Sequence, residues 1–378
     1  MDQNIITPEP EETFSTSEKT TIMPPGKNTK DVLEYFSRLA KNGIEKGSSD
    51  IFLSSGCKPL YRIDGKTIFL EKEPILSSEI IEYYIQTIMS DFDKKKLKEN
   101  LEHDFGVTIE NGCRFRINTF YQRNGISAAM RIIPNRIFSF EELKLPSELK
   151  KIVDIESGLI LCTGAAGSGK STTLATIIDQ INQKYKKHII TIEDPIEYLH
   201  ENKKSLVEQR SVDVDTLSFS NALRSSLRQA PDVLLVGELR DLESLSLAIS
   251  AAETGTLVFG TLHSNNAAGT INRIIDIFPA DQQNQVRIQL SQSLQSIIWQ
   301  KLLPHKSGKG RVAACEILFR NPAIANLIRE NKIYQIESAI ETSSKDDNML
   351  SFREMMTYLL ENQEINKETS EKTLQSRR

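Results

Sequence analysis

Residues 158–172 read GLILCTGAAGSGKST, and this stretch decides the fold. An apolar run leads into GAAGSGKST at 164–172, which fits the pattern G-x-x-x-x-G-K-[ST] at every fixed position. The helical pattern TTLATIIDQIN follows directly. A strand, a glycine-rich loop and a helix in this order can hold phosphate groups on backbone N–H groups and on the helix N-terminus. The stretch therefore predicts a phosphate-binding loop in an α/β domain.

The loop supplies most of the candidate nucleotide-binding residues. Its glycines let the backbone curl around phosphate oxygens, Lys170 is expected to reach the β- and γ-phosphates of ATP, and Ser171 is expected to bind Mg²⁺. A strand-to-helix turn that binds nothing is the weaker interpretation, because all fixed positions and both flanks are present. The candidate residues are Gly164, Ala165, Ala166, Gly167, Ser168, Gly169, Lys170, Ser171 and Thr172.

Four further apolar runs follow the loop, at 188–194, 232–238, 256–263 and 312–318, and helical patterns separate most of them. Strands that alternate with helices predict a mainly parallel sheet covered on both faces. In open sheets of this kind, ligands bind beyond the carboxyl ends of the strands. Side chains that end these runs are therefore candidates for the site.

Two runs end in acids. DVLLVGELRD places Glu238 at a strand end, where a carboxylate can orient and deprotonate an attacking water. Many ATPases carry a metal-binding Asp directly before that acid, but here the position is Gly237. TIEDPIEY ends in Glu193 and Asp194, and one of them can hold Mg²⁺ in place of the missing Asp, directly or through water. A turn with solvated acids is the alternative for this second motif.

A third run, within GTLHSNNAAG, ends in His263. A neutral imidazole at this edge can hydrogen-bond a γ-phosphate or relay its loss to the next element. A structural histidine is the alternative interpretation.

The region before the loop has a different pattern. Apolar residues at helical spacing occur at 31–43 and 78–89, and alternating runs at 50–70 and 103–134 indicate strands with Asp-Gly and Asn-Gly turns. A small α+β domain is expected here. The organisation predicted for the chain is a disordered tail at 1–27, an N-terminal domain at 28–135, a linker at 136–150, an ATPase domain at 151–365 with a helical C-terminal part, and a polar tail at 366–378.

Arginines form another constellation. Arg114 and Arg116 lie two residues apart and share a face if their segment is a strand, and basic residues there can contact phosphate across an interface. A solvated basic strand is the commoner case. The remaining arginines considered for such a role are Arg123 and Arg131 in the N-terminal domain, and Arg224, Arg228 and Arg240 near the second acidic strand.

Composition limits the classes of function. The 378 residues carry a net charge of −4 with a pI near 5.9, which gives no general attraction to nucleic acid. The four cysteines form no CxxC pair, so a structural zinc site is not expected. The N-terminus has neither the basic start nor the apolar core of a signal peptide, and no run has the length needed to span a bilayer. We expect a cytoplasmic protein that reaches membranes through partners.

Together these motifs resemble the PilT/PilU-type ATPases of type IV pili, within the secretion ATPase superfamily. The resemblance runs from about residue 31 to about 361 and rests on GAAGSGKST, ITIEDPIEY, LLVGELRD, GTLHSNNAA and PAIANLIRE, in that order. Glycine before the acid of LLVGELRD is usual in this family. The chain departs from the family at Ala165-Ala166, where Pro-Thr is common, and at Ala325, which replaces an arginine. Short segments such as YQRNG and LRQAPDV resemble the PilU branch.

The resemblance implies a PAS-like N-terminal domain, a RecA-like P-loop NTPase domain and a hexameric ring with ATP bound between subunits. It implies that Glu238 is the catalytic base, with Lys170, Glu193 and His263 in the same site, and that Arg116 and Arg131 reach the nucleotide. The implied cofactors are ATP and Mg²⁺, the latter on Ser171, Glu193 and Asp194.

The leading hypothesis is a hexameric ATP-driven motor for pilus retraction and twitching motility. It would act on an inner-membrane platform protein from the cytoplasmic face. One alternative is an accessory ATP-binding subunit that works with a paralogous retraction ATPase. Another is a type II secretion or pilus assembly ATPase, which the absence of a tetracysteine zinc insertion disfavours. A nucleic-acid translocase on the same core is disfavoured by the acidic pI.

Overall fold

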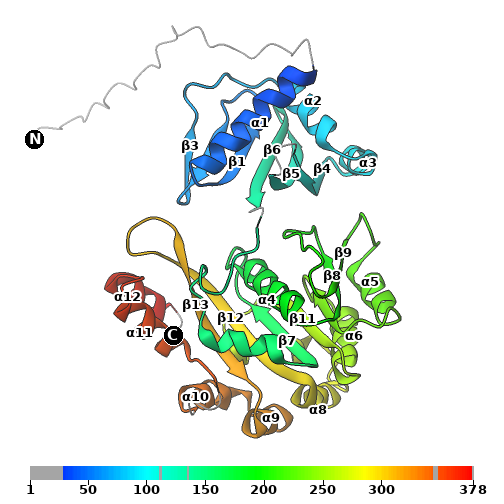
Figure 1. The fold of residues 1–378 in the computed structure, drawn as a ribbon, viewed down its shortest axis with the longest axis vertical. Coiled ribbons are helices and arrows are strands. Elements are labelled where there is room, and N and C mark those ends of the chain that lie inside the picture. The colour runs from blue at the N-terminus through cyan, green and yellow to red at the C-terminus, as the bar shows by residue number, and fades with distance from the viewer. Residues whose placement is uncertain (1–28, 110–112, 134–135, 344–347, 377–378) are drawn as a thin grey trace, which may run out of the picture.

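Two lobes follow each other along the chain (Figure 1). The computed structural model describes residues 29–109, 113–133, 136–343 and 348–376. The predicted disordered tail at 1–27 lies outside these residues, as does the first Asn-Gly turn of the N-terminal domain. Among the helices within the described ranges, none combines the length and the apolar character needed to cross a membrane.

The N-terminal lobe is an antiparallel sheet packed against helices. Its six strands lie in the order β3-β2-β1-β6-β5-β4, and its core joins apolar side chains of α1, α2 and α3 to those of the strands. The predicted helices are confirmed, and the Asp64-Gly65 turn joins β2 to β3 as expected. The elements are α1 (Thr29–Glu45), β1 (Ser48–Ser54), β2 (Leu60–Ile63), β3 (Lys66–Phe69), α2 (Ser78–Ile88), α3 (Asp91–Asn100), β4 (Glu102–Thr108), β5 (Arg114–Gln122) and β6 (Gly125–Ile133).

The C-terminal lobe is built on a seven-stranded sheet in the order β13-β12-β7-β11-β10-β8-β9. Neighbouring strands are parallel, except that β13 runs antiparallel to β12. The predicted α/β fold class with a mainly parallel sheet is confirmed. The strands are β7 (Gly158–Thr163), β8 (His188–Glu193), β9 (Leu206–Ser211), β10 (Val233–Val236), β11 (Leu257–Leu262), β12 (Leu294–Pro304) and β13 (Arg311–Phe319).

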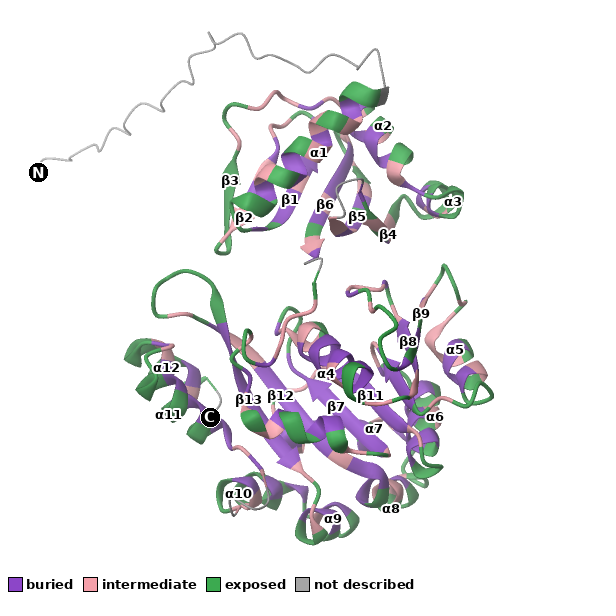
Figure 2. Ribbon diagram, in the orientation of Figure 1, coloured by how far each residue is buried: buried purple, intermediate pink, exposed green. Residues whose placement is uncertain are grey.

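Helices cover both faces of this sheet, and the strands between them, apart from the edge strand β9, are largely buried (Figure 2). One face packs against η1 and α4. The other packs against α5 to α10, while α11 and α12 cover the β12–β13 end. The helices are η1 (Ser147–Asp154), α4 (Lys170–Lys184), α5 (Phe219–Ser226), α6 (Leu242–Glu253), α7 (Ala267–Ile277), α8 (Gln283–Ser293), α9 (Pro322–Arg329), η2 (Ile333–Gln335), α10 (Ile336–Glu341), α11 (Phe352–Glu361) and α12 (Lys367–Gln375).

Three elements of the C-terminal lobe differ from the sequence-based expectation. β9 and β12 are strands where none is predicted, because β9 is a half-exposed edge strand with few apolar residues and β12 follows α8 without a breaking residue. The sequence predicts a polar tail at 366–378, whereas the structure forms α12 there. Asn366 caps this helix by accepting a hydrogen bond from the backbone N–H of Thr369 at 2.7 Å, and α12 packs on α11.

The parallel strands bring their carboxyl ends to one edge of the sheet. β7 leads into the glycine-rich loop, β8 ends at Glu193, β10 ends directly before Gly237, and β11 ends directly before His263. The N-terminal lobe lies over this edge (Figure 1). The fold therefore gathers the candidate residues between the two lobes.

Candidate active site

The glycine-rich loop connects β7 to α4 and is already curled. Gly169 adopts φ +91° and forms the N-cap of α4, a backbone conformation that side-chain-bearing residues rarely adopt. The Lys170 Nζ donates to the carbonyl oxygens of Gly164 at 2.9 Å and Ala165 at 3.0 Å. Burial lowers the pKa of Lys170. The ammonium thus lies inside the loop, where the oxygens of a phosphate can replace those carbonyls.

A hollow of about 710 Å³ separates the lobes at this edge and collects most of the candidate residues. Four helices and strands of the C-terminal lobe, with their loops, and four strands of the N-terminal lobe line it. The predicted site residues on its wall are Ala166, Gly167, Lys170, Ser171, Glu193, Asp194, Glu238, His263, Arg116 and Arg131.

Other predicted residues lie elsewhere. Gly169 and Thr172 line a neighbouring hollow of about 560 Å³, next to the start of α4. Gly164, Ala165 and Ser168 belong to the loop but line neither of these two hollows.

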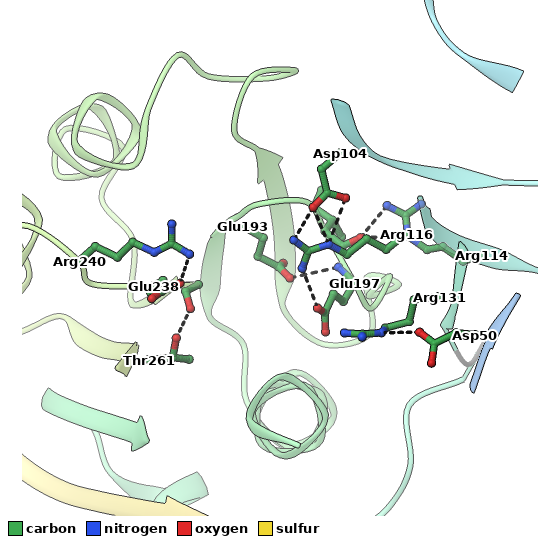
Figure 3. Close-up of polar contacts among 12 residues, drawn as sticks. Asp50, Asp104, Arg114, Arg116, Arg131, Glu193, Glu197, Glu238, Arg240 and Thr261 are labelled. Carbon is green, nitrogen blue, oxygen red and sulfur yellow. Dashed lines mark hydrogen bonds and ion pairs between the residues drawn. The ribbon is translucent and has the colours of Figure 1, made fainter. Parts of the chain in front are cut away.

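Glu238 is held between two basic side chains. Its carboxylate lies 2.6 Å from Arg240 Nη2 (Figure 3). It also lies 3.4 Å from His263 Nε2. Burial raises the pKa of Glu238, but the hydrogen bond and charge of Arg240, with the charges of His263 and Lys170, outweigh it and hold the pKa below its usual value. The carboxylate is therefore ionised and available as a base.

His263 bridges the glycine-rich loop and Glu238. Its Nδ1 lies 3.0 Å from the carbonyl oxygen of Gly164. Because a carbonyl only accepts, Nδ1 carries the proton in this contact. The imidazole thus touches both the loop that would hold phosphate and the candidate base.

Gly237 has a steric reason to lack a side chain. Its N–H donates to the carbonyl oxygen of Ile192 at 2.7 Å. A Cβ at this position would lie 3.1 Å from that oxygen and 3.3 Å from the Cα of Glu193. The side chain of an aspartate at this position would therefore be crowded by the end of β8, where Glu193 lies.

Glu193 is fixed by three donors. The Thr191 hydroxyl donates to it at 2.7 Å, the Gln209 amide at 3.2 Å and the Glu197 N–H at 3.5 Å. Burial raises the pKa of Glu193 despite these hydrogen bonds. Burial also raises the pKa of Asp194, against the charge of Arg116. A nearby cation would favour the ionised form of both acids.

Oxygen ligands for Mg²⁺ are present, but the protein does not form a complete cage for it. Within the described ranges, no group of three or more His, Cys, Asp or Glu side chains could hold a metal ion. Magnesium is commonly bound by one or two protein ligands together with substrate phosphates. The Ser171 hydroxyl and the carboxylates of Glu193 and Asp194, all on the wall of one hollow, fit that mode.

The arginines of the N-terminal lobe already contact acids. Arg116 Nη2 lies 2.7 Å from Asp104, and its Nη1 lies 3.5 Å from Glu197 of the C-terminal lobe (Figure 3). Arg114 donates across the same gap to the carbonyl oxygen of Ile196 at 2.8 Å. These contacts tie β5 to the loop after β8.

Arg131 pairs instead with Asp50 of its own lobe at 3.2 Å, and its side chain is 56% exposed. Arg123 lies in the exposed β5–β6 turn and is not on the wall of the larger hollow. Arg240 binds Glu238 of its own chain, so its place in an intersubunit site remains a hypothesis.

The model of the family described as "Type II/IV secretion system protein" matches residues 27–375. The chain belongs to this family. The match covers both lobes, so the hollow lies between two parts of the chain that both belong to the family model.

Two pilus ATPases are similar to this protein over most of its chain. The type IV pilus retraction ATPase PilT of Pseudomonas aeruginosa is 49% identical over 312 residues, which cover 82% of this chain and 89% of that protein. The type IV pilus ATPase PilU of the same organism is 40% identical over 330 residues, covering 87% and 86%. Both branches match, which is consistent with the resemblance to PilU, although the identity to PilT is higher.

A solved structure of the pilus retraction motor PilT with bound ADP aligns with a TM-score of 0.80 and 47% identity. The alignment covers 89% of this chain and 95% of that one. The predicted fold, a P-loop ATPase domain preceded by a small α+β domain, is therefore confirmed for this family member.

Sequence reasoning missed the acids that hold the arginines. Glu197 lies within TIEDPIEY, four residues after Glu193, but only its approach to Arg116 singles it out. Asp104 and Asp50 belong to the N-terminal domain, whereas the glycine-rich loop belongs to the ATPase domain. Their pairing with Arg116 and Arg131 depends on strand register, since Gly106 is opposite Arg116 and Asp50 is opposite Arg131.

Replacing Arg240 is expected to move the acid limb of the pH profile. Arg240→Gln removes the main group that lowers the pKa of Glu238, so that pKa rises and the carboxylate becomes protonated at a higher pH. The acid-side midpoint of kcat/KM for ATP hydrolysis should therefore move to higher pH. Arg38→Gln is the matched control, because Arg38 pairs with Glu73 in the N-terminal lobe. An unchanged midpoint, or one that moves to lower pH, would contradict this account of Glu238.

Proposed function

We propose that this chain is an ATP-hydrolysing motor that powers retraction of type IV pili, and with it twitching motility. The observation that carries the proposal is the hollow between the lobes. The glycine-rich loop, Glu238 at a strand end and basic residues of a second lobe line this one space, as the proposal requires. Family membership and the similarity to PilT along both lobes support the pilus-specific part.

The larger hollow would take the phosphates of the nucleotide. Lys170 would exchange its two carbonyl acceptors for β- and γ-phosphate oxygens, and loop N–H groups would hold the remaining oxygens. The neighbouring hollow at the start of α4 has apolar side chains, among them Leu143, Leu145 and Leu302, on its wall. We assign the base of the nucleotide to that space.

Hydrolysis would use Glu238 as the base. Its carboxylate would orient a water against the γ-phosphate and accept a proton from it, while Lys170 stabilises the charge that spreads over the phosphate oxygens. Mg²⁺, when bound by Ser171 with Glu193 or Asp194, neutralises phosphate charge. His263 contacts both the loop and Glu238. Loss of the γ-phosphate would therefore change the contacts of His263 at the end of β11 and could move the element that follows it.

The arginines would couple the nucleotide to the N-terminal lobe. Arg116 now holds Asp104 and Glu197, and a phosphate would compete with these acids for its guanidinium. Arg131, which pairs with Asp50 of its own lobe, would be the second to reach the nucleotide. Exchange of these partners would change the orientation of the N-terminal lobe relative to the C-terminal lobe. ATP hydrolysis would in this way be coupled to a movement of the lobes.

The assembly we propose is a homohexamer at the cytoplasmic face of the inner membrane, acting on the pilus platform protein. The domain division at 28–135 and 151–365, with a linker between, would let each subunit bend. Two alternatives keep the same chemistry: an accessory ATP-binding subunit that works with a paralogous retraction ATPase, and an assembly or type II secretion ATPase.

Deletion of the gene, followed by imaging of labelled pili in live cells, tests the proposed function. Cells without the chain should extend pili that stay extended, and a wild-type copy should restore retraction. Retraction that fails only against a load would favour the accessory role with a paralogue. Cells that lose pili altogether would overturn the retraction motor in favour of an assembly ATPase.

A further inference from the structure

We propose that Gln300 is a positioning residue that holds the glycine-rich loop in its nucleotide-binding form. Gln300 lies on β12, a strand that the sequence does not reveal and that carries none of the motifs described above. The inference rests on the proposed nucleotide site and adds a residue that acts on that site through the glycine-rich loop.

Strand pairing places Gln300 beside the loop. β12 runs parallel to β7, with Trp299 opposite Thr163, the last residue of β7. The next residue on each strand brings Gln300 alongside Gly164, where the loop begins. Its side chain is buried, with 2% of the residue exposed.

The Gln300 amide connects the end of the glycine-rich loop to the first turn of α4. Its Nε2 donates to the carbonyl oxygen of Ser168 at 2.8 Å, and its Oε1 accepts from the hydroxyl of Thr173 at 2.8 Å. The carbonyl can only accept, so the orientation of the amide is fixed by Ser168. Ser168 directly precedes Gly169, the N-cap of α4, and Thr173 lies in the first turn of that helix. Lys170 and Ser171, the residues expected to meet the phosphates and Mg²⁺, lie between these two attachment points.

Two glycines of the motif fit around the same residue. A Cβ at Gly164 would lie 2.3 Å from the backbone oxygen of Gln300, and a Cβ at Gly169 would lie 2.7 Å from its Nε2. Real Cβ atoms essentially never approach so closely. Both glycines also have positive φ values, +140° and +91°. Gly169 therefore leaves room for the Gln300 side chain, and Gly164 leaves room for the backbone of β12.

Because the loop is held before the nucleotide arrives, binding needs less ordering of the backbone. That advantage is the same for bound ATP, for bound ADP and for the transition state. Losing it should weaken binding of every nucleotide while leaving turnover at saturation nearly unchanged. A residue that matters only for folding would instead lower the active fraction, which reduces the apparent kcat and leaves KM unchanged.

The test measures the Kd for MgADP and the KM and kcat for MgATP on the purified full-length chain. Gln300→Glu keeps the size of the side chain but turns an oxygen toward the Ser168 carbonyl. It should raise Kd and KM about tenfold, the effect of one or two lost buried hydrogen bonds. Thr173→Val, which removes only the hydroxyl donor, should raise both by a smaller factor, and Thr173→Ser should restore the wild-type values.

Gln295→Glu is the matched control, because it makes the same chemical change at the other end of β12 and should leave Kd and KM as in the wild type. A folded Gln300→Glu variant with unchanged Kd would overturn the inference, as would a lower kcat with unchanged KM. If Gln300→Glu does not fold, equal Kd values for Thr173→Val and Thr173→Ser would overturn it. Wild-type protein that binds no MgADP would overturn the proposed function as well, whereas wild-type binding with an unaffected Gln300→Glu overturns the inference alone.

Discussion

Glu238→Gln is expected to bind MgATP about as tightly as the wild type and to hydrolyse it at least about 100-fold more slowly. The substitution preserves the shape of the side chain and removes the carboxylate that would accept the proton of the attacking water. A positioned general base contributes about 10²- to 10⁴-fold to rate. Binding should survive because the phosphate contacts would come from the glycine-rich loop and Lys170, which follow β7, whereas Glu238 follows β10.

Single-turnover hydrolysis of bound ATP, measured beside the Kd for MgATP, separates the two effects. Glu253→Gln is a suitable control, since the exposed Glu253 carboxylate lies at the end of α6, where it accepts a hydrogen bond from Gln289. Wild-type turnover in Glu238→Gln would remove Glu238 from the role of base. The neighbouring Glu193, whose pKa is raised by burial, would then be the next carboxylate to replace.

Much of this site could be predicted from the sequence because its chemistry is encoded locally. The glycine-rich loop is recognisable from nine consecutive residues. The strand before it and the helix after it are equally clear in the sequence. Glu238 and His263 could be placed because each ends an apolar run, and parallel strands bring their ends to one edge. These predictions need the alternation of strands and helices but no knowledge of which strands are neighbours.

The contacts that depend on strand order could not be predicted. Gln300 lies 132 residues after Ser168 in sequence, and only the parallel pairing of β12 with β7 brings the two together. β12 itself was hidden because α8 runs into it at Leu294 without a glycine or proline to separate them. The pairing of Arg116 with Glu197 likewise requires the two lobes to be in place.

Gly237 is a second feature whose physical cause could not be predicted from the sequence. The sequence reveals the missing aspartate but not its cause, which is the approach of β8 to within 3.1 Å of the position that a Cβ would take. The proposed replacement of that aspartate by an acid of a neighbouring strand would fit this close packing. The candidate acids lie at the ends of β8 and β10, so no single motif contains them all.

Lys170→Ala should abolish nucleotide binding rather than the chemical step. The Lys170 ammonium makes two hydrogen bonds inside the loop, and each charge-assisted hydrogen bond that it would make to phosphate contributes about 1.5–3 kcal/mol. Loss of two such bonds corresponds to a rise in the Kd for MgATP of at least about 100-fold. MgADP should raise the melting temperature of the wild type and leave that of Lys170→Ala unchanged, because only a bound ligand shifts the folding equilibrium.

Lys184→Ala provides the control for this experiment, since Lys184 is an exposed lysine at the opposite end of the same helix, where it pairs with Asp154. It should respond to MgADP like the wild type. The two large predictions also check each other: Glu238→Gln should keep the ligand-induced rise in melting temperature and lose turnover, whereas Lys170→Ala should lose both. A Lys170→Ala chain that MgADP still stabilises would mean that the loop N–H groups bind the phosphates unaided. The ammonium inside the loop would then serve only to complete the loop's own hydrogen bonds.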